Sequence, residues 1–239
     1  MEKKISFVIP VYNEEESIVP LYNAIKKVVT DHNYVYEIVT VDDGSTDNTL
    51  EILKTLKKDD GNLKVVVFEE NRGQSAAFEA GFKNATGEIV VTMDADLQNN
   101  PEDVPRMLKY IEFYDVVCGF RAKRQDNFIR KISSKIGNFI RNKLTNDNIV
   151  DTGCSLKVFK KEYLDKIKMY KGMHRFLPTL LKLEGATVYQ TEVSHFERKY
   201  GESKYGLGIK KRAVVAFFDL LAVRWMIKRH INYKIKEII

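Results

Sequence analysis

Two aspartates separated by one residue, Asp94 and Asp96, follow an apolar run of the chain. At the end of a strand, two carboxylates with one residue between them come near one point once the chain turns. Carboxylate oxygens select a hard cation, typically Mg²⁺ or Mn²⁺ shared with the phosphates of a substrate. Gln98 could add a carbonyl oxygen. The spacing predicts a metal site that neutralises a departing diphosphate, although Asp-x-Asp also occurs in ordinary polar loops.

A second pair of aspartates, Asp42 and Asp43, ends another apolar run and precedes a glycine and three polar residues. An aspartate in this place can accept hydrogen bonds from the ribose or the base of a nucleotide. The alternative is that Asp43 and Ser45 only satisfy backbone N–H groups at a turn. For residues 45–47 we expect the capping of a helix.

The first half of the chain alternates short apolar runs with amphipathic patterns, which predict strands and helices in turn. The expected strands cover residues 5–10, 36–41, 63–68, 88–93 and 114–119, and the expected helices cover residues 14–29, 46–58, 73–85 and 101–111. Asn100 before Pro101 is typical of a helix start. We therefore expect an α/β fold with a mostly parallel sheet and helices on both faces. Ligands of such sheets bind beyond the carboxyl ends of the strands, where both aspartate pairs are expected.

The second half differs in pattern and in charge. It begins with a basic amphipathic helix over residues 124–144, and strands near 155–159 and 187–193 and a helical tail follow. Without an internal repeat or linker, we expect one domain over residues 1–208 and an amphipathic tail over 209–239. The net charge is −10 for residues 1–120 (12 basic, 22 acidic) and +16 for residues 121–239 (27 basic, 11 acidic). The basic half suits phosphates or an anionic membrane, with unevenly distributed solvated charge as the alternative.

Four motifs occur in order in the first half: Pro10-Val-Tyr-Asn-Glu14, Val41-Asp-Asp-Gly-Ser-Thr-Asp47, Asn71-Arg-Gly73 and Asp94-Ala-Asp-Leu-Gln98. Together they resemble the family-2 glycosyltransferases with the GT-A fold. This resemblance implies a nucleotide-sugar donor, a divalent metal and inversion at the anomeric carbon. It also implies a set of donor-site residues: Pro10, Tyr12, Glu14, Asp42, Asp43, Asp94 and Ala95.

Later motifs further resemble the polyprenyl-phosphate subgroup, which includes dolichyl-phosphate mannosyltransferase. They are Gly119-x-Arg121, the run from Asp151 to Lys157, and His195-x-x-Arg198 followed by Gly201-Glu-Ser-Lys-Tyr205. In that subgroup the last arginine and lysine lie near phosphates, which implies donor contacts for Arg198 and Lys204. The catalytic residues implied are Asp94, Asp96, Arg121 and Arg198. His195 either orients a phosphate or is a partly buried structural histidine.

A phosphate monoester as the acceptor would explain the choice of basic residues. It is already largely ionised near neutral pH and can attack with little help from a base. It needs positioning against repulsion from the donor diphosphate, which arginines provide through charge-assisted hydrogen bonds. Arg121, Arg124 and Arg130 are the candidates, and the alternative for each is a solvated arginine on a basic helix.

The tail combines basic, aromatic and apolar residues: Lys210-Lys-Arg212, then Phe217, Phe218 and Trp225, then Lys228-Arg-His230. This pattern is typical of anchoring at a membrane surface, although a buried helix or a dimer contact would share it. Residues 213–227 are interrupted by charges and are too few for a spanning helix. The apolar run at the N-terminus is too short for a secretory signal. We expect a peripheral protein at the cytoplasmic face of a membrane.

The expected activity is a metal-dependent, inverting transfer of a hexose from a nucleoside-diphosphate sugar to undecaprenyl or dolichyl phosphate, with Mg²⁺ or Mn²⁺ as cofactor. Residues 151–157 and 219–225 resemble bacterial enzymes that use undecaprenyl phosphate, and this resemblance implies a UDP-sugar as the donor, with GDP-mannose as the other candidate. Further expected partners are an anionic membrane surface and a second copy of the chain, but not nucleic acid. The alternatives are a family-2 transferase with a polysaccharide or protein acceptor, and a non-catalytic nucleotide-binding module.

Overall fold

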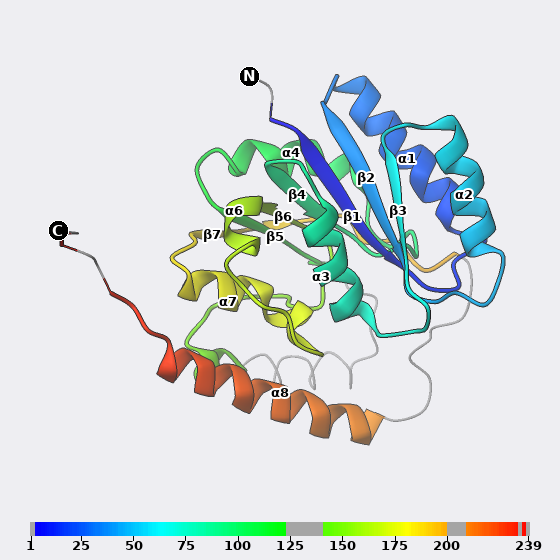
Figure 1. Cartoon of the computed structure of the whole chain (residues 1–239). Helices are drawn as coiled ribbons and strands as arrows, with labels where there is room; N and C mark the ends of the chain where they lie inside the picture. The colour runs from blue at the N-terminus through cyan, green and yellow to red at the C-terminus, as the bar shows by residue number, and fades with distance from the viewer. Residues whose placement is uncertain (1–2, 123–140, 200–208, 234–235, 238–239) are drawn as a thin grey trace.

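The structure is a computed structural model of the 239-residue chain. It describes residues 3–122, 141–199, 209–233 and 236–237. Within these residues a seven-stranded sheet is covered by helices on both faces (Figure 1). The predicted basic helix over residues 124–144 lies mostly outside the described residues, and its described end, residues 141–144, is helical.

Every expected strand is present. The strands are β1 (Ile5–Val11), β2 (Tyr36–Asp42), β3 (Leu63–Val67), β4 (Ile89–Thr92), β5 (Val116–Phe120), β6 (Lys157–Lys160) and β7 (Val188–Glu192). Their order across the sheet is β3-β2-β1-β4-β6-β5-β7, and β6 runs antiparallel to both of its neighbours. The remaining pairs are parallel, which confirms the predicted sheet. Because β1, β2 and β4 are parallel neighbours, the segments that follow them meet at one edge.

The helices divide between the two faces of the sheet. One face is covered by α1 (Ile18–Asp31), α2 (Thr49–Asp59), the 3₁₀ turn η1 (Pro101–Asp103) and α4 (Val104–Tyr110). The other face carries α3 (Gln74–Asn84), α6 (Lys161–Leu164), η2 (Met173–Phe176), α7 (Leu177–Leu183) and α8 (Ile209–Arg229). Strand β1 serves both sides, because successive strand residues point to opposite faces. Its Phe7 and Ile9 join the first core cluster, and Val8 joins the second.

The loops after β1 and β2 bind each other, and this corrects one prediction. We expected a helix from residue 46 capped by Ser45, but α2 begins at Thr49. The Ser45 Oγ accepts the backbone N–H of Asn13 at 3.0 Å, and the N–H of Thr46 donates to Asn13 Oδ1 at 2.7 Å. The capping prediction for Ser45 and Thr46 is wrong, because both residues are bound to the neighbouring loop.

Two other predicted turn residues do satisfy backbone groups at helix starts. Asp47 accepts the N–H of Thr49 at 3.0 Å, at the first residue of α2. Asn100 accepts the N–H of Glu102 at 3.1 Å and precedes the proline that opens η1. The predicted cap at Asn100 is therefore confirmed.

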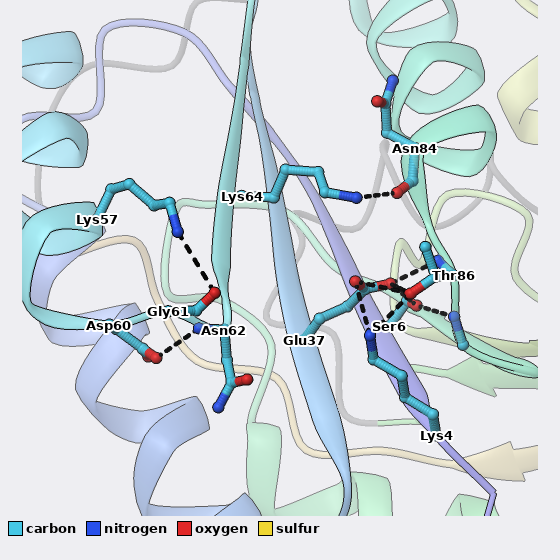
Figure 2. A network of polar contacts seen from close by, with 11 residues as sticks. Lys4, Ser6, Glu37, Lys57, Asp60, Gly61, Asn62, Lys64, Asn84 and Thr86 are labelled. Carbon is cyan, nitrogen blue, oxygen red and sulfur yellow. Dashed lines mark hydrogen bonds and ion pairs between the residues drawn. The ribbon is translucent and has the colours of Figure 1, made fainter.

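A buried carboxylate ties the strands together at their amino ends (Figure 2). Glu37 on β2 accepts hydrogen bonds from Ser6 Oγ at 2.6 Å, from Lys4 Nζ at 3.0 Å, and from the backbone and hydroxyl of Thr86. Burial alone would raise the pKa of Glu37, but these donors outweigh it and lower the pKa to about 2. The network joins β1, β2 and the segment that leads into β4.

We expect Glu37→Gln to lower the free energy of unfolding at pH 7 by about 2 kcal/mol, because the amide NH₂ would face groups that also donate. The pKa of Glu37 in the folded state lies below its ordinary value of 4.5. The ionised carboxylate therefore stabilises the fold fully above pH 4.5, and this stabilisation is lost as the pH falls toward 2. Chemical denaturation should therefore show a smaller difference between variant and wild type at pH 3. The exposed Glu112→Gln is the control. An equal deficit at both pH values would contradict an ionic origin.

Candidate functional site

A cavity of about 190 Å³ lies at the edge of the sheet where β1, β2 and β4 end. Its lining comes from five segments: residues 10–12 with Glu14 at and after the end of β1, Asp43 after β2, residue 71 with residues 73–74 at the start of α3, residues 94–96 after β4, and Arg198. Parallel sheets bind their ligands at this end of the strands. The structure thus brings most of the predicted donor and metal residues into one cavity.

The central feature of the cavity is the pair Asp94 and Asp96. The Oδ1 atom of Asp94 accepts a hydrogen bond from Gln74 Nε2 at 2.7 Å, and its backbone N–H donates to Ser155 Oγ at 3.1 Å. The Oδ2 atom of Asp96 accepts from Arg198 Nη2 at 2.8 Å. Burial and then the negative charge of Asp96 raise the pKa of Asp94 to about 6. The fold therefore holds two carboxylates close enough to repel each other, and a bound cation would relieve this repulsion.

The turn after the aspartates fixes the direction of Asp96. Leu97 has a φ of 61°, in the left-handed region that side chains other than glycine rarely adopt. This conformation brings the backbone N–H of Gln98 to Asp96 Oδ1 at 3.1 Å. The side-chain nitrogen of Gln98 lies 3.4 Å from the carbonyl of Phe196, and Gln98 is not among the described residues that line the cavity. A metal contact of Gln98 stays a prediction.

The residues present fit a hard divalent cation. Asp94 and Asp96 supply carboxylate oxygens, the ligand type that Mg²⁺ and Mn²⁺ accept. Across the described ranges, no three His, Cys, Asp or Glu side chains come together as a complete protein-built metal site. A cation here would take its further oxygen ligands from a bound phosphate or from water, as Mg²⁺ commonly does.

The two aspartates at the end of β2, Asp42 in the strand and Asp43 directly after it, have different surroundings. Asp43 lines the cavity, and its carboxylate accepts the backbone N–H of Arg72 at 2.7 Å and that of Gly73 at 2.9 Å. Burial raises the pKa of Asp43, although these two donors act against it. Asp42 is buried, accepts the N–H of Ser45 at 3.4 Å, and is absent from the cavity lining that the described residues form. Asp43 thus satisfies backbone donors and also faces the cavity.

Arg198 lies between acidic residues from two segments. Its Nη2 atom contacts Asp96, and its Nη1 atom is 3.6 Å from Glu14 Oε1. The other oxygen of Glu14 accepts from Ser17 Oγ at 2.7 Å, at the start of α1. Arg198 therefore joins the loop after β1 to the loop after β4.

Arg121 forms a two-pronged ion pair with Asp151. The distances are 2.7 Å from Nε to Oδ2 and 2.9 Å from Nη2 to Oδ1, and the exposed fractions of the side chains are 15% and 8%. Its positive charge acts to lower the pKa of Asp94. Arg121 is not one of the described residues that line the cavity. Its contact with an acceptor stays a prediction, and Arg124, Arg130 and Lys204 lie outside the described residues.

Sequence reasoning missed several side chains that support the aspartate pair. Gln74 and Ser155 bind Asp94 directly, and the buried Lys157 donates to the carbonyl of Cys154 while acting to lower the pKa of Asp94. Gln74 follows the motif at residues 71–73, and the other residues lie within the motif at 151–157. These two sequence motifs therefore indicated which segments lie near the aspartate pair, but not which of their side chains contact it.

Residues 6–168 match the family model for Glycosyl transferase family 2. The chain belongs to this family and is a glycosyltransferase with the GT-A fold.

Its relatives include sugar transferases with polyprenyl-phosphate substrates in their names. An undecaprenyl-phosphate 4-deoxy-4-formamido-L-arabinose transferase of Serratia proteamaculans is 39% identical over 221 residues, which are 92% of this chain and 67% of the relative. A dodecaprenyl-phosphate galacturonate synthase of Rhizobium johnstonii is 35% identical over 231 residues, or 94% of this chain and 68% of the relative.

Solved structures with the same fold are more distant in sequence. Glucosyl-3-phosphoglycerate synthase from Mycobacterium tuberculosis, in complex with Mn²⁺, UDP and phosphoglyceric acid, aligns with a TM-score of 0.68 at 19% identity, covering 96% of this chain and 80% of that protein. The mannosyltransferase PcManGT from Pyrobaculum calidifontis, in complex with GDP-Man and Mn²⁺, aligns with a TM-score of 0.66 at 19% identity, covering 98% and 66%. At this identity the likeness supports the fold.

Proposed function

We propose that this protein transfers a hexose, with inversion, from a nucleoside-diphosphate sugar to a polyprenyl phosphate at the cytoplasmic face of a membrane. The observation that carries the proposal is the aspartate pair beside Arg198 in the cavity beyond β1, β2 and β4. The names of relatives at 35–39% identity, which specify undecaprenyl and dodecaprenyl phosphate, support the choice of acceptor. A UDP-sugar is the favoured donor and GDP-mannose the second candidate.

In this proposal the chain's own residues mainly hold and orient charge. Asp94 and Asp96 would hold Mg²⁺ or Mn²⁺, which when bound neutralises charge on the departing diphosphate. Arg198 donates charge-assisted hydrogen bonds to the diphosphate.

The remaining residues position the two substrates. The nucleotide and sugar are bounded by the lining residues Pro10, Tyr12, Glu14, Asp43 and Ala95. The predicted contacts of Lys204 with the diphosphate, and of Arg121, Arg124 and Arg130 with the acceptor phosphate, complete the arrangement. An ionised acceptor phosphate attacks the anomeric carbon without needing a protein base.

The proposal is tested by incubating the purified protein with Mn²⁺, undecaprenyl phosphate in vesicles, and a panel of radiolabelled UDP-sugars and GDP-mannose. We expect label to enter the organic phase for one donor and only with the metal present. A second incubation with added native membranes supplies protein and polysaccharide acceptors, and label in these with none in lipid would favour the other acceptor classes and overturn the proposal. Thermal shifts with UDP and GDP would identify the base independently, because binding to the native state raises its melting temperature.

The outer face of α8 supports the membrane part of the proposal. This helix lies beside α7 at the outside of the molecule (Figure 1), with Leu220 and Val223 buried in the second core cluster. Its other side carries large apolar side chains that are 40–64% exposed: Val214, Val215, Phe217, Phe218, Leu221 and Trp225. Exposed basic residues, Lys228 and Arg229, end the helix. An apolar face bordered by cations suits an anionic lipid surface.

In the described part of the chain, no helix combines the length and the apolar character that crossing a membrane requires.

We expect the double variant Phe218→Glu, Trp225→Glu to bind anionic phosphatidylglycerol vesicles at least about tenfold more weakly, because each aromatic side chain contributes a few kcal/mol when it leaves water. Co-sedimentation with vesicles measures the change. Phe113→Glu is the matched control, since Phe113 is 77% exposed on the loop after α4. Unchanged vesicle binding would contradict the membrane role, and a change from dimer to monomer in sedimentation would instead indicate contact with a second copy.

A further inference from the structure

Arg198 pairs with one of the two carboxylates that would hold the proposed metal. Its guanidinium lies 2.8 Å from Asp96 Oδ2 and 3.6 Å from Glu14 Oε1, and its side chain is 21% exposed, against 9% for Asp96 and 10% for Glu14. The other oxygen of Asp96 accepts the backbone N–H of Gln98. Both carboxylate oxygens of Asp96 are therefore engaged by donors from the protein itself.

A divalent cation that binds Asp96 must compete with this arrangement. Two cations a few ångströms apart repel strongly where few water molecules screen them, and the partly buried Arg198 would lose its contact with Asp96. Arg198 also cancels one of the two negative charges that Asp94 and Asp96 present. A metal ion that arrives alone therefore meets a weakened site.

A nucleoside diphosphate changes this balance. Its oxygens are acceptors that match a guanidinium, so they can take over the N–H donors that Arg198 gives to Asp96. The released carboxylate is then available to the cation, and the added negative charge compensates both the metal and Arg198.

From this geometry we infer that Arg198 is an internal counter-ion, and that the cavity takes up the divalent metal and the nucleoside diphosphate as one complex rather than the metal first. The inference rests on the metal–donor site of the proposed function. Arg198 thereby couples the binding of the metal to that of the nucleoside diphosphate, so that each ligand raises the affinity of the cavity for the other.

The test is a titration of the full chain with Mn²⁺. The electron paramagnetic resonance signal of the free ion measures how much Mn²⁺ is bound. Without nucleotide, Arg198→Gln should bind Mn²⁺ about tenfold more tightly than the wild type, because the competing cation is gone. With saturating UDP or GDP, the wild type should tighten its Mn²⁺ binding at least tenfold, and Arg198→Gln by less than about threefold. Arg198→Lys keeps the charge and should resemble the wild type in free-metal affinity.

Arg106→Gln is the matched control. Arg106 also pairs with an aspartate, at 2.7 Å from Asp103 Oδ1, but it is not among the described lining residues of the cavity. Its loss should leave Mn²⁺ binding unchanged, and an equal tightening in this control would overturn the inference by assigning the effect to net charge.

Two further outcomes are distinguishable. Nucleotide-dependent Mn²⁺ binding in the wild type, with no gain of free-metal affinity in Arg198→Gln, would overturn the counter-ion role alone. Absence of Mn²⁺ binding in all variants, with UDP and GDP present, would overturn the metal site of the proposed function and the inference with it.

Discussion

Asp96→Asn is expected to lower the rate of sugar transfer by about 10³-fold or more while the protein stays folded. Asp96 gives the site one of its two carboxylates, and an amide is a neutral and much weaker ligand for a hard cation. Charge on the departing diphosphate would then lack its main compensation. The rate is measured under saturating Mn²⁺ with the donor identified in the vesicle assay.

The fold should tolerate this change. Asp96 stands beside Asp94, so removing one charge relieves a repulsion that contributes to the raised pKa of Asp94. We expect the free energy of unfolding to remain within about 1 kcal/mol of the wild type. Asp59→Asn, which removes an exposed carboxylate at the end of α2, should retain full activity. If Asp96→Asn kept most of its metal-dependent rate, the central role of the aspartate pair would be wrong.

Arg121→Met is expected to lower the free energy of unfolding by about 3–5 kcal/mol, because it removes the two-pronged guanidinium contact of the buried Asp151. The exposed fraction of Asp151 is only 8%, so water cannot take the place of the guanidinium. Transfer activity should also be lost if Arg121 meets the acceptor phosphate. The single variant cannot separate these two causes.

A second variant separates them. Arg121→Met combined with Asp151→Leu removes the whole ion pair, and replacing a buried pair by apolar residues is often neutral for stability. We expect denaturation curves to recover part of the loss while the transfer rate stays low, because the backbone N–H groups of Arg121 and Gly153 still lose their acceptor on Asp151. Recovery of the rate together with stability would assign Arg121 a purely structural role and remove it from the acceptor site.

The sequence predicted the fold well because strands and helices are encoded by local patterns. The alternation in β1, with Phe7 and Ile9 on one side and Val8 on the other, is visible in the residues themselves. The position of the aspartate pairs beyond the strand ends followed from the same patterns. The exception was Ser45, whose hydroxyl is bound to a residue 32 positions away rather than to the helix that follows.

The contacts within the site were not predictable from local patterns. Arg198 and Asp96 are 102 positions apart, and Arg121 and Asp151 are 30 apart. Which charged residues meet depends on how loops from separate elements fold over one edge of the sheet. The resemblance marked Arg198 as a phosphate ligand, but its contact with a proposed metal carboxylate came only from the structure.

The Glu37 network has a consequence for engineering new specificities. It joins β1, β2 and the segment before β4 at the strand ends opposite the cavity. The two ends of a seven-residue strand such as β1 are about 20 Å apart. Substitutions at the residues that line the cavity lie away from this network, so we expect variant libraries built there to keep the scaffold undisturbed.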